Sequence, residues 1–409
     1  MSVTKGARMG QVVWALGLTQ IIGYGTLYYS FGTLAPAMAK EFGWSEEWVF
    51  GLLSASLLAG GLVAPISGRL ADKYGTAQLM AVGSVAAALA LALCALAPNG
   101  MVFAAGLVAM EVASAFVLYA TAFAALAQAS PIAARLSITH LTLIAGFAST
   151  IFWPLTAWLH QLFSWRDVYL IYAASNLLFC VPVHIWLARG HRRRTAEHRE
   201  APVTPALVPA ERQRGALVLM LAGFALVGFV SSAITVHMVP LLASLGAGEA
   251  GVLATTLFGP AQVLSRLVNM QFGRGLSQPA LAVIAAVVLP VGLAVLLLTT
   301  PWLPGAAAFA ILFGLGNGLY SIVSGTLPLV LFGSAGYGRR LGMISSSRLL
   351  ASAAAPFAFS LFAGAGSTGL AVIATAGVGV VAVLVFVALR VIGGAASMQS
   401  GKPVPATAP

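Results

Sequence analysis

Residues 279–299 read PALAVIAAVVLPVGLAVLLLT, an apolar run without a charged side chain. A helix of about 20 such residues is long enough to cross the hydrocarbon core of a bilayer. Similar runs recur along the 409-residue chain, which is 60% hydrophobic and 8% charged, with a mean hydropathy of +0.96. Soluble domains carry about a quarter charged residues, so the solvent of this surface must be lipid. Barrel strands would alternate in polarity over about ten residues, and we therefore predict an all-α polytopic membrane protein.

Polar breaks divide the chain into twelve predicted membrane helices. Their approximate ranges are 11–38, 47–66, 78–97, 101–127, 138–160, 168–188, 216–244, 249–271, 279–299, 303–331, 341–363 and 369–391. The one long hydrophilic stretch lies between the sixth and the seventh, and its charge and proline content predict a linker without a core. The predicted organisation is an N-terminal six-helix bundle at 1–188, a cytoplasmic basic linker at 189–215, a C-terminal six-helix bundle at 216–391 and a disordered cytoplasmic tail at 392–409.

Basic residues favour one side of the predicted helices. If the N-terminus is cytoplasmic, the opposite side keeps only Lys40 and Arg166. The cytoplasmic segments then hold Lys5, Arg8, Arg69, Lys73, Arg135, the arginines of the linker, Arg274, Arg339, Arg340, Arg390 and Lys402. This asymmetry predicts a plasma-membrane protein, in a bacterium one of the inner membrane, with both termini in the cytoplasm. The formal net charge of +11 therefore reflects topology, and the lipid bilayer rather than nucleic acid is the expected partner.

The hairpin after the second predicted helix reads GRLADKYG at residues 68–75. Gly68 permits a close approach of helices, Gly75 permits a tight turn, and Asp72 lies where it can cap or pair with a neighbouring helix end. The hairpin resembles the signature loop of the major facilitator superfamily, Gly-x-x-x-Asp-Arg/Lys-x-Gly. The resemblance implies two six-helix halves with a central substrate site, and a gate in which Asp72, Arg69 and Lys73 lock the halves together until the protein changes state.

The second half carries a faint echo of this hairpin. After the eighth predicted helix the chain reads SRLVN at 265–269 and FGRG at 272–275, so Asn269 stands where the first half has Asp72. A second charge lock is therefore not expected.

Three ionisable residues lie inside predicted membrane helices: Glu111 in the fourth, Arg266 in the eighth and Arg348 in the eleventh. A charge at mid-membrane costs about 2.5–3.5 kcal/mol on insertion scales, so such residues face a bundle interior or a wet cavity. Arg266 shares one helical stripe with Gln262, which is typical of a cavity wall. Glu111 is expected either to carry a coupled proton or to serve as a fixed counter-ion of an arginine.

One cation on each of two helices of the same half resembles the oxalate/formate and monocarboxylate branch of the superfamily. The resemblance implies that Arg266 and Arg348 bind the carboxylates of the substrate. Arg348 stands where the oxalate branch carries a lysine. Guanidinium groups suit bidentate binding of carboxylates.

Softer candidates complete the predicted substrate site. Gln20, Tyr24 and Tyr28 repeat every four residues in the first predicted helix, and Asn317 and Tyr320 lie in the tenth. For each of them helix–helix hydrogen bonding is an open alternative.

Motifs of catalysis are missing from the sequence. It has no metal-ligand spacing, phosphate-binding loop or nucleophile motif, so we expect neither an enzyme nor a cofactor. We predict a monomeric secondary active transporter that works by alternating access and moves a small organic anion, a mono- or dicarboxylate, with a coupled proton or counter-solute. The alternatives are efflux of a small toxic solute, such as a trivalent arsenical or a drug, and a membrane sensor that binds solute without moving it.

Overall fold

The computed structural model describes residues 2–197, 204–247, 254–365 and 367–399, and all regular elements among these residues are helices. Their contacts divide the chain into two units. Unit 1 comprises Met1–Thr204 and Ser334–Ser346, and unit 2 comprises Pro205–Gly333 and Ser347–Pro409. The predicted all-α membrane fold is confirmed, with the six predicted helices of each half gathered in its own unit apart from the first turns of the eleventh.

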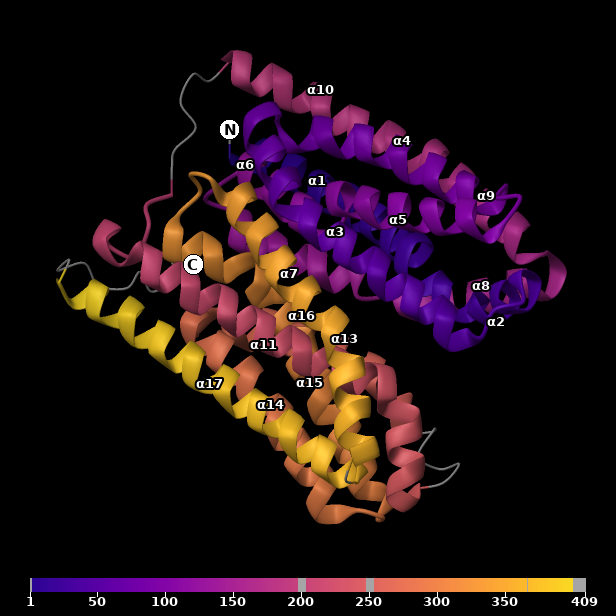
Figure 1. Cartoon of the computed structure of the whole chain (residues 1–409). Coiled ribbons are helices and arrows are strands. Elements are labelled where there is room, and N and C mark those ends of the chain that lie inside the picture. The colour runs from indigo at the N-terminus through magenta and orange to yellow at the C-terminus, as the bar shows by residue number, and fades with distance from the viewer. Residues whose placement is uncertain (1, 198–203, 248–253, 366, 400–409) are drawn as a thin grey trace. The chain divides into compact units, whose positions relative to one another are not determined.

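Unit 1 consists of helices interrupted by short irregular turns (Figure 1). They are α1 (Ser2–Tyr24), the π-helical turn η1 (Gly25–Tyr29), α2 (Ser30–Phe42), α3 (Glu46–Tyr74), α4 (Thr76–Ala95), α5 (Gly100–Val117), α6 (Tyr119–Ala129), α7 (Ala134–Ala145), α8 (Ala148–Leu162), α9 (Trp165–Ser175), the π-helical turn η2 (Asn176–Cys180) and α10 (Val181–Glu197). Side-chain caps fix two of the helix starts: Ser45 accepts a hydrogen bond from Trp48 N (3.3 Å), and Asn99 accepts one from Val102 N (3.0 Å).

The core of unit 1 forms around α4, which packs against α5, α9 and α10. Figure 1 shows α4 and α10 side by side along one edge of the unit. Phe31, Leu91, Phe103 and Tyr169 are buried in one apolar cluster from four different helices. Because α4 is rich in alanine, its neighbours approach closely, as dispersion-driven packing in a membrane requires.

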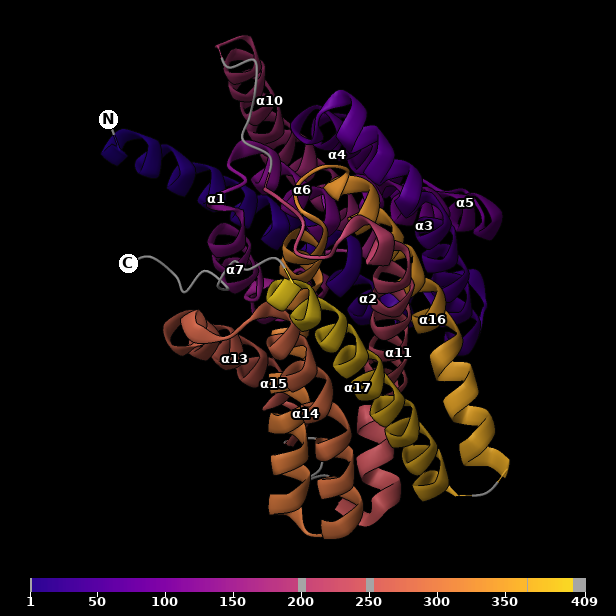
Figure 2. The same cartoon turned by 90° about the vertical axis from the view of Figure 1, so that its left-hand side faces the viewer.

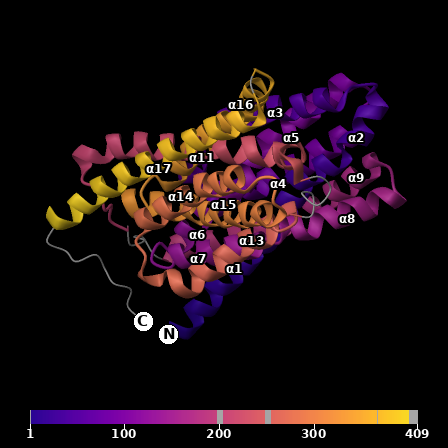
Figure 3. The same ribbon diagram turned by 90° about the horizontal axis from the view of Figure 1, so that it is seen from below.

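Unit 2 consists of longer helices (Figures 2 and 3). They are α11 (Ala210–Leu242), η3 (Ala243–Ala247), α13 (Phe258–Phe272), the short 3-10 turn η4 (Gly273–Gly275), α14 (Gln278–Thr299), α15 (Leu303–Phe332), α16 (Tyr337–Ala365) and α17 (Thr368–Gln399). Helix α14 packs against α15 and α17, and α15 also packs against α13. A Cβ on Gly318 would lie 2.0 Å from Ser265 Oγ, so glycine is what lets α15 approach α13 so closely.

Nine of the described helices are long and apolar enough to span a membrane. Three predicted spans fall outside this set. They are the first, in which several polar and tyrosine side chains interrupt the apolar run, the eighth, whose predicted start lies in residues 248–253 outside the described residues, and the eleventh, which is α16 with its serines and Arg348.

Two helices extend past the predicted domain boundaries. α10 continues beyond residue 188 to Glu197, and α17 continues beyond residue 391 to Gln399. At the end of the predicted linker the backbone pairs with α15, because Leu207 N and Val208 N donate to the carbonyls of Val330 (3.3 Å) and Leu331 (3.0 Å). Residues 198–203 of the predicted linker and 400–409 of the predicted tail lie outside the described residues.

Candidate functional site

The hairpin at residues 68–75 connects α3 to α4 and presents a carboxylate to the start of α16. Asp72 Oδ1 accepts a hydrogen bond from Gly338 N (2.9 Å), and Oδ2 accepts one from Arg339 N (2.8 Å). These amides belong to the first turn of α16, where the helix has no acceptors of its own and its dipole is positive. The first turns of α16 belong to unit 1, so this contact lies within that unit.

Glycines set the geometry of this contact. A Cβ on Gly68 would lie 2.2 Å from the carbonyl oxygen of Gly338, and Gly75 has a φ of 90°. Arg69 and Lys73 form no ion pair with a described residue, and Lys73 Nζ lies 5.0 Å from the centroid of the neighbouring Tyr74 ring. Of the three charges in the hairpin, Asp72 is therefore the one bonded to α16 in the described part of the chain.

Glu111 lies in α5, in the interior of unit 1, and is 4% exposed. Its Oε2 accepts a hydrogen bond from Ser114 Oγ (3.4 Å), while the same hydroxyl donates more closely to the Glu111 carbonyl (2.7 Å). Its Oε1 is buried and has no hydrogen-bond partner among the described residues. A buried carboxyl oxygen without a donor is costly for the fold, and Glu111 is the acidic residue among the groups of unit 1 in this state, which also include Gln20 Oε1 and His160 Nδ1.

The fourth predicted span is broken next to Glu111, which the sequence did not predict. Leu118 has extended backbone angles (φ −84°, ψ −167°) and separates α5 from α6. Side chains satisfy the carbonyls freed at the break. Gln20 Nε2 donates to Val117 O (2.7 Å) and Ser67 Oγ donates to Ala115 O (2.7 Å). Irregular backbone at membrane depth is tolerated only with such partners, and Gln20 is therefore a support of the helix break.

The predicted stripe of Gln20, Tyr24 and Tyr28 assumes an uninterrupted α-helix, and η1 changes it. A π-helical turn accommodates an extra residue, so positions five apart come together across it. The rings of Tyr24 and Tyr29 accordingly lie 6.3 Å apart, and Tyr24 also contacts Tyr119 at 4.6 Å. Tyr28 is 49% exposed and packs edge-on against Tyr29 at 5.3 Å.

Buried polar contacts tie the irregular turns of unit 1 together. Asn176 Nδ2, at the start of η2, donates to Thr26 Oγ1 of η1 (2.9 Å). His184 lies between Ser84 Oγ (2.8 Å to Nδ1) and Thr19 Oγ1 (3.1 Å to Nε2). The ring of His184 therefore links Ser84 of α4 to Thr19 of α1, whose own hydroxyl proton is donated to Leu16 O (3.0 Å).

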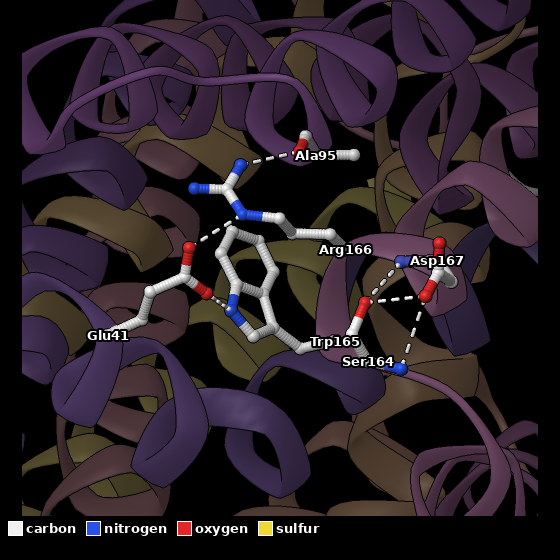
Figure 4. A network of polar contacts seen from close by, with 6 residues as sticks. All are labelled: Glu41, Ala95, Ser164, Trp165, Arg166 and Asp167. Atoms are coloured by element: carbon white, nitrogen blue, oxygen red, sulfur yellow. Dashed lines mark hydrogen bonds and ion pairs between the residues drawn. The ribbon is translucent and has the colours of Figure 1, made fainter.

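A further cluster of unit 1 surrounds Arg166, one of two basic residues predicted on the non-cytoplasmic side (Figure 4). Arg166 Nε pairs with Glu41 Oε1 at 2.7 Å, and its terminal nitrogen donates to Ala95 O at 2.5 Å. The Trp165 indole donates to the other oxygen of Glu41, and Ser164 and Asp167 form a capping box at the start of α9. The cluster joins α2, α4 and α9, and the Ser-x-x-Asp spacing was the signal for it in the sequence.

Arg266 lies in α13 of unit 2 and is 5% exposed. Its Nε contacts Ser321 Oγ (3.1 Å) and Gly318 O (3.4 Å), both on α15. The side chain of Gln262, one turn earlier, makes no hydrogen bond with a described residue, and its backbone carbonyl accepts from Ser265 Oγ (2.9 Å). Arg266 therefore joins α13 to α15 where the sequence predicted a cavity wall.

Arg348 lies in α16 of unit 2 and is half-buried. Its stem packs on α11, because a Cβ on Gly228 would lie 2.8 Å from Arg348 Cγ. Ser352, one turn on, donates to Gly228 O (3.1 Å), and Ser232 donates to Ser352 O (2.7 Å), so the two helices are held closely here. The guanidinium makes no hydrogen bond or ion pair with a described residue, although Tyr320 lies within electrostatic range of it.

Two predicted residues of α15 contact α11 in the same region. Tyr320 Oη donates to Phe224 O (2.9 Å), and Asn317 Oδ1 accepts from Ser231 Oγ (3.0 Å). Asn317 Nδ2 is buried and has no acceptor among the described residues. The sequence predicted Arg348, Asn317 and Tyr320 separately, and in unit 2 each of them contacts α11. Gly228 and Ser231, which position them, were missed, because a glycine and a serine in an apolar helix carry no signal of their own.

Comparisons with known proteins agree on the family. The sequence matches the family model of the Major Facilitator Superfamily over residues 16–356. A search of curated proteins gave no match. Among solved structures, the human organic anion transporter MFSD10 (TETRAN) superposes with a TM-score of 0.70 at 16% identity, over 93% of this chain and 99% of that chain.

Two further structures superpose over nearly their whole length. The proton:xylose symporter XylE, bound to 6-bromo-6-deoxy-D-glucose, gives a TM-score of 0.67 at 14% identity, over 92% of this chain and 95% of that chain. FucP, in the outward conformation, gives 0.66 at 14% identity, over 94% of this chain and 98% of that chain. At these identities the likeness shows a common fold. Together with the sequence match, it establishes that the chain belongs to the major facilitator superfamily of membrane transporters.

Proposed function

We propose that this protein is a secondary active transporter that moves a small organic anion by alternating access, with Arg348 as the group that binds the anion. The observation that carries the proposal is the state of this guanidinium. It is half-buried in a membrane helix and bonded to no described residue. A cation in this position is costly without a counter-ion. A carboxylate from solution supplies that counter-ion and matches the guanidinium fork.

Arg266 has a different place in the proposal. Its Nε is already engaged with α15, so a substrate carboxylate competes with protein acceptors for it. We propose that Arg266 also binds the anion but contributes less to affinity than Arg348. Gln262 lies one turn away on the same stripe of α13. The two residues predicted as a pair are thus unequal, and Arg348 is expected to dominate affinity.

Glu111 is proposed as the coupling group, binding the proton that travels with the anion. Its Oε1 is buried without a donor, so the carboxyl has an oxygen on which a proton can be placed. One charge moved across the bilayer costs about 2.3 kcal/mol per 100 mV of opposing potential. Moving one proton with one monovalent anion transfers no net charge, which makes this stoichiometry the economical one. The alternative is that Glu111 is a fixed counter-ion of an arginine, and uptake by Glu111→Gln under a proton gradient separates the two roles.

Asp72 is proposed as part of the gate. Its two bonds to the first turn of α16 stabilise one state, and we infer that they open in the other. In this proposal Arg69 and Lys73 act through the cytoplasmic surface potential instead of through a bond to α16. We propose that both termini lie in the cytoplasm, which the distribution of basic residues supports.

Exchange in proteoliposomes tests the proposal. Vesicles holding purified protein and unlabelled formate, acetate, oxalate or succinate are diluted into the same labelled anion. Wild type should exchange at least one of them, Arg348→Gln should lose more than about 90% of the rate, and Arg390→Gln, an exposed arginine of α17, should behave as wild type. Full exchange by Arg348→Gln would remove this residue from the site. Arsenite and drug export by the same vesicles addresses efflux, which no contact of the buried Cys94 or Cys180 favours.

A further inference from the structure

One face of α11 organises the region around Arg348. Phe224, Gly228 and Ser231 follow the spacing i, i+4, i+7 and therefore share a stripe of the helix. Tyr320 binds this stripe at Phe224, and the stem of Arg348 packs on it at Gly228. Ser231 lies one turn beyond Gly228, a rise of about 4.5 Å.

Asn317 meets the same stripe at Ser231. The Ser231 hydroxyl donates to Asn317 Oδ1 (3.0 Å), which fixes the orientation of the amide. Asn317 Nδ2 is thereby directed away from Ser231, and it is buried with no acceptor among the described residues. A buried donor left without an acceptor is unfavourable, and native structures keep such groups mainly where a water, an ion or a ligand completes them.

The neighbourhood of this amide selects an acceptor over a donor. The stem of Arg348 packs on α11 at Gly228, one helical turn from the Ser231 that bonds Asn317, and the hydroxyls of Tyr320 and Ser231 already donate to Phe224 O and Asn317 Oδ1. No described carboxylate bonds to Asn317 or Arg348. Asn317 Nδ2 and the guanidinium of Arg348 are thus the two groups of this set with N–H protons that no described residue accepts, and an oxyanion can accept from both.

We propose that Asn317 is a specificity-determining residue that donates the second hydrogen bond to the anion held by Arg348, and that Ser231 is the positioning residue that orients its amide. This inference rests on the proposed binding of an anion by Arg348. The neutral amide of Asn317 would select the anion by the position of its oxygens, and the guanidinium of Arg348 would select it by charge.

Replacing the donor by an acceptor gives the sharpest test. Asn317→Asp keeps the shape of the side chain and places a carboxylate beside Arg348. We expect it to weaken binding of formate, acetate, oxalate or succinate by roughly a hundredfold or more, because the new carboxylate repels and replaces the anion. Its melting temperature without anion should equal or exceed that of wild type, since the two groups form an ion pair. A purely structural asparagine would show a lowered melting temperature instead.

The positioning role has its own variants. Ser231→Ala frees the amide, and we expect about tenfold weaker binding, the loss of one neutral hydrogen bond. Ser231→Thr keeps the hydroxyl and should restore the affinity. Thr375→Ala is the matched control, because this buried hydroxyl of α17 donates only to its own helix at Ala371 O (2.7 Å).

Dissociation constants come from the anion dependence of the melting temperature of the full chain in detergent. Wild-type affinity in Asn317→Asp, or equal affinities in Ser231→Ala and Ser231→Thr, would overturn the inference while leaving anion binding by Arg348 intact. If none of the four carboxylates stabilises wild type, or if Arg348→Gln binds them as wild type does, the proposed function fails and the inference falls with it.

Discussion

The two units treat polar side chains in their membrane helices differently. Unit 1 bends its helices at η1, at Leu118 and at η2, and side-chain donors bond to the irregular backbone there, as Gln20 Nε2 does to Val117 O and Ser67 Oγ does to Ala115 O. Unit 2 keeps α14, α15, α16 and α17 continuous, and there the guanidinium of Arg348 and the amide nitrogen of Asn317 have no partner among the described residues. A polar group that is hydrogen-bonded within the protein supports the fold, whereas one without a protein partner is available to a solute. The open atoms of unit 1 include two acceptor oxygens, Oε1 of Glu111 and Oε1 of Gln20, whereas the two groups just named in unit 2 are donors, and the proposed recognition of an anion therefore belongs to unit 2.

The largest expected effect concerns the carboxyl of Glu111 in unit 1. Glu111→Gln cannot bind and release the coupled proton, so we expect accumulation of labelled anion driven by an inward proton gradient to fall by more than about tenfold, while anion exchange without net proton movement continues. Uptake into proteoliposomes at imposed pH gradients measures this. Gradient-driven accumulation that survives in Glu111→Gln, or a wild type that ignores the gradient, would remove proton coupling from unit 1.

Helix approach in unit 2 gives the next largest effect. Gly318→Ala would place its Cβ 2.0 Å from Ser265 Oγ and 2.4 Å from Gln262 O, so α13 and α15 must separate. We expect the free energy of unfolding to fall by about 1–3 kcal/mol in denaturant titrations in detergent. Gly259→Ala on α13 has nothing within 4 Å of its Cβ and is the control. Equal stability of the two variants would show that α13 and α15 are more loosely packed than described.

Two glutamines test the contrast directly. Gln20→Leu leaves the Val117 carbonyl without its donor at the helix break, and we expect a loss of about 1–3 kcal/mol in unfolding free energy. Gln262→Leu in unit 2 removes a side chain without a protein partner and should stay within about 0.5 kcal/mol of wild type. If Gln262→Leu lost more unfolding free energy than Gln20→Leu, the contrast between polar groups bonded within the protein and polar groups without a protein partner would be wrong.

The smallest effect is expected at the hairpin. Asp72→Asn keeps one acceptor but removes the charge at the N-terminus of α16, and about 1 kcal/mol of stability should be lost in the state described here. Lys73→Gln, at a residue without an ion pair, should change stability by much less. Thermal unfolding in detergent at low and high salt separates the two, because the contribution of Asp72 should shrink as salt rises.

The sequence alone predicted the class of fold, the order of its membrane helices and the position inside them of three charges, the buried Glu111 and Arg266 and the half-buried Arg348. These follow from composition and from the cost of a charge in lipid, which local sequence reports well. The π-helical turns and the break at Leu118 were not predicted, since they depend on distant partners: Thr26 meets Asn176, and Val117 meets Gln20. For the same reason periodicity placed Tyr24 and Tyr28 on one stripe, whereas η1 pairs Tyr24 with Tyr29.

The candidate site shows the same limit. Arg266 and Arg348 looked equivalent in the sequence, because both interrupt an apolar helix. Their difference arises from neighbours on other helices, Ser321 and the carbonyl of Gly318 for Arg266 and the bare surface of Gly228 for Arg348. Which charge is satisfied is a tertiary property that no local pattern encodes.

The central claim is that unit 2 recognises negative charge through Arg348. Its most direct test compares a carboxylate with its uncharged amide of the same shape, acetate with acetamide and oxalate with oxamide, in binding to purified wild type and Arg348→Gln. The account predicts that at least one carboxylate binds wild type at least about tenfold more tightly than its amide, that Arg348→Gln abolishes this preference, and that the variant melts no lower than wild type because an uncompensated charge has been removed. Equal affinity of carboxylate and amide for wild type, or an unchanged preference in Arg348→Gln, would contradict it.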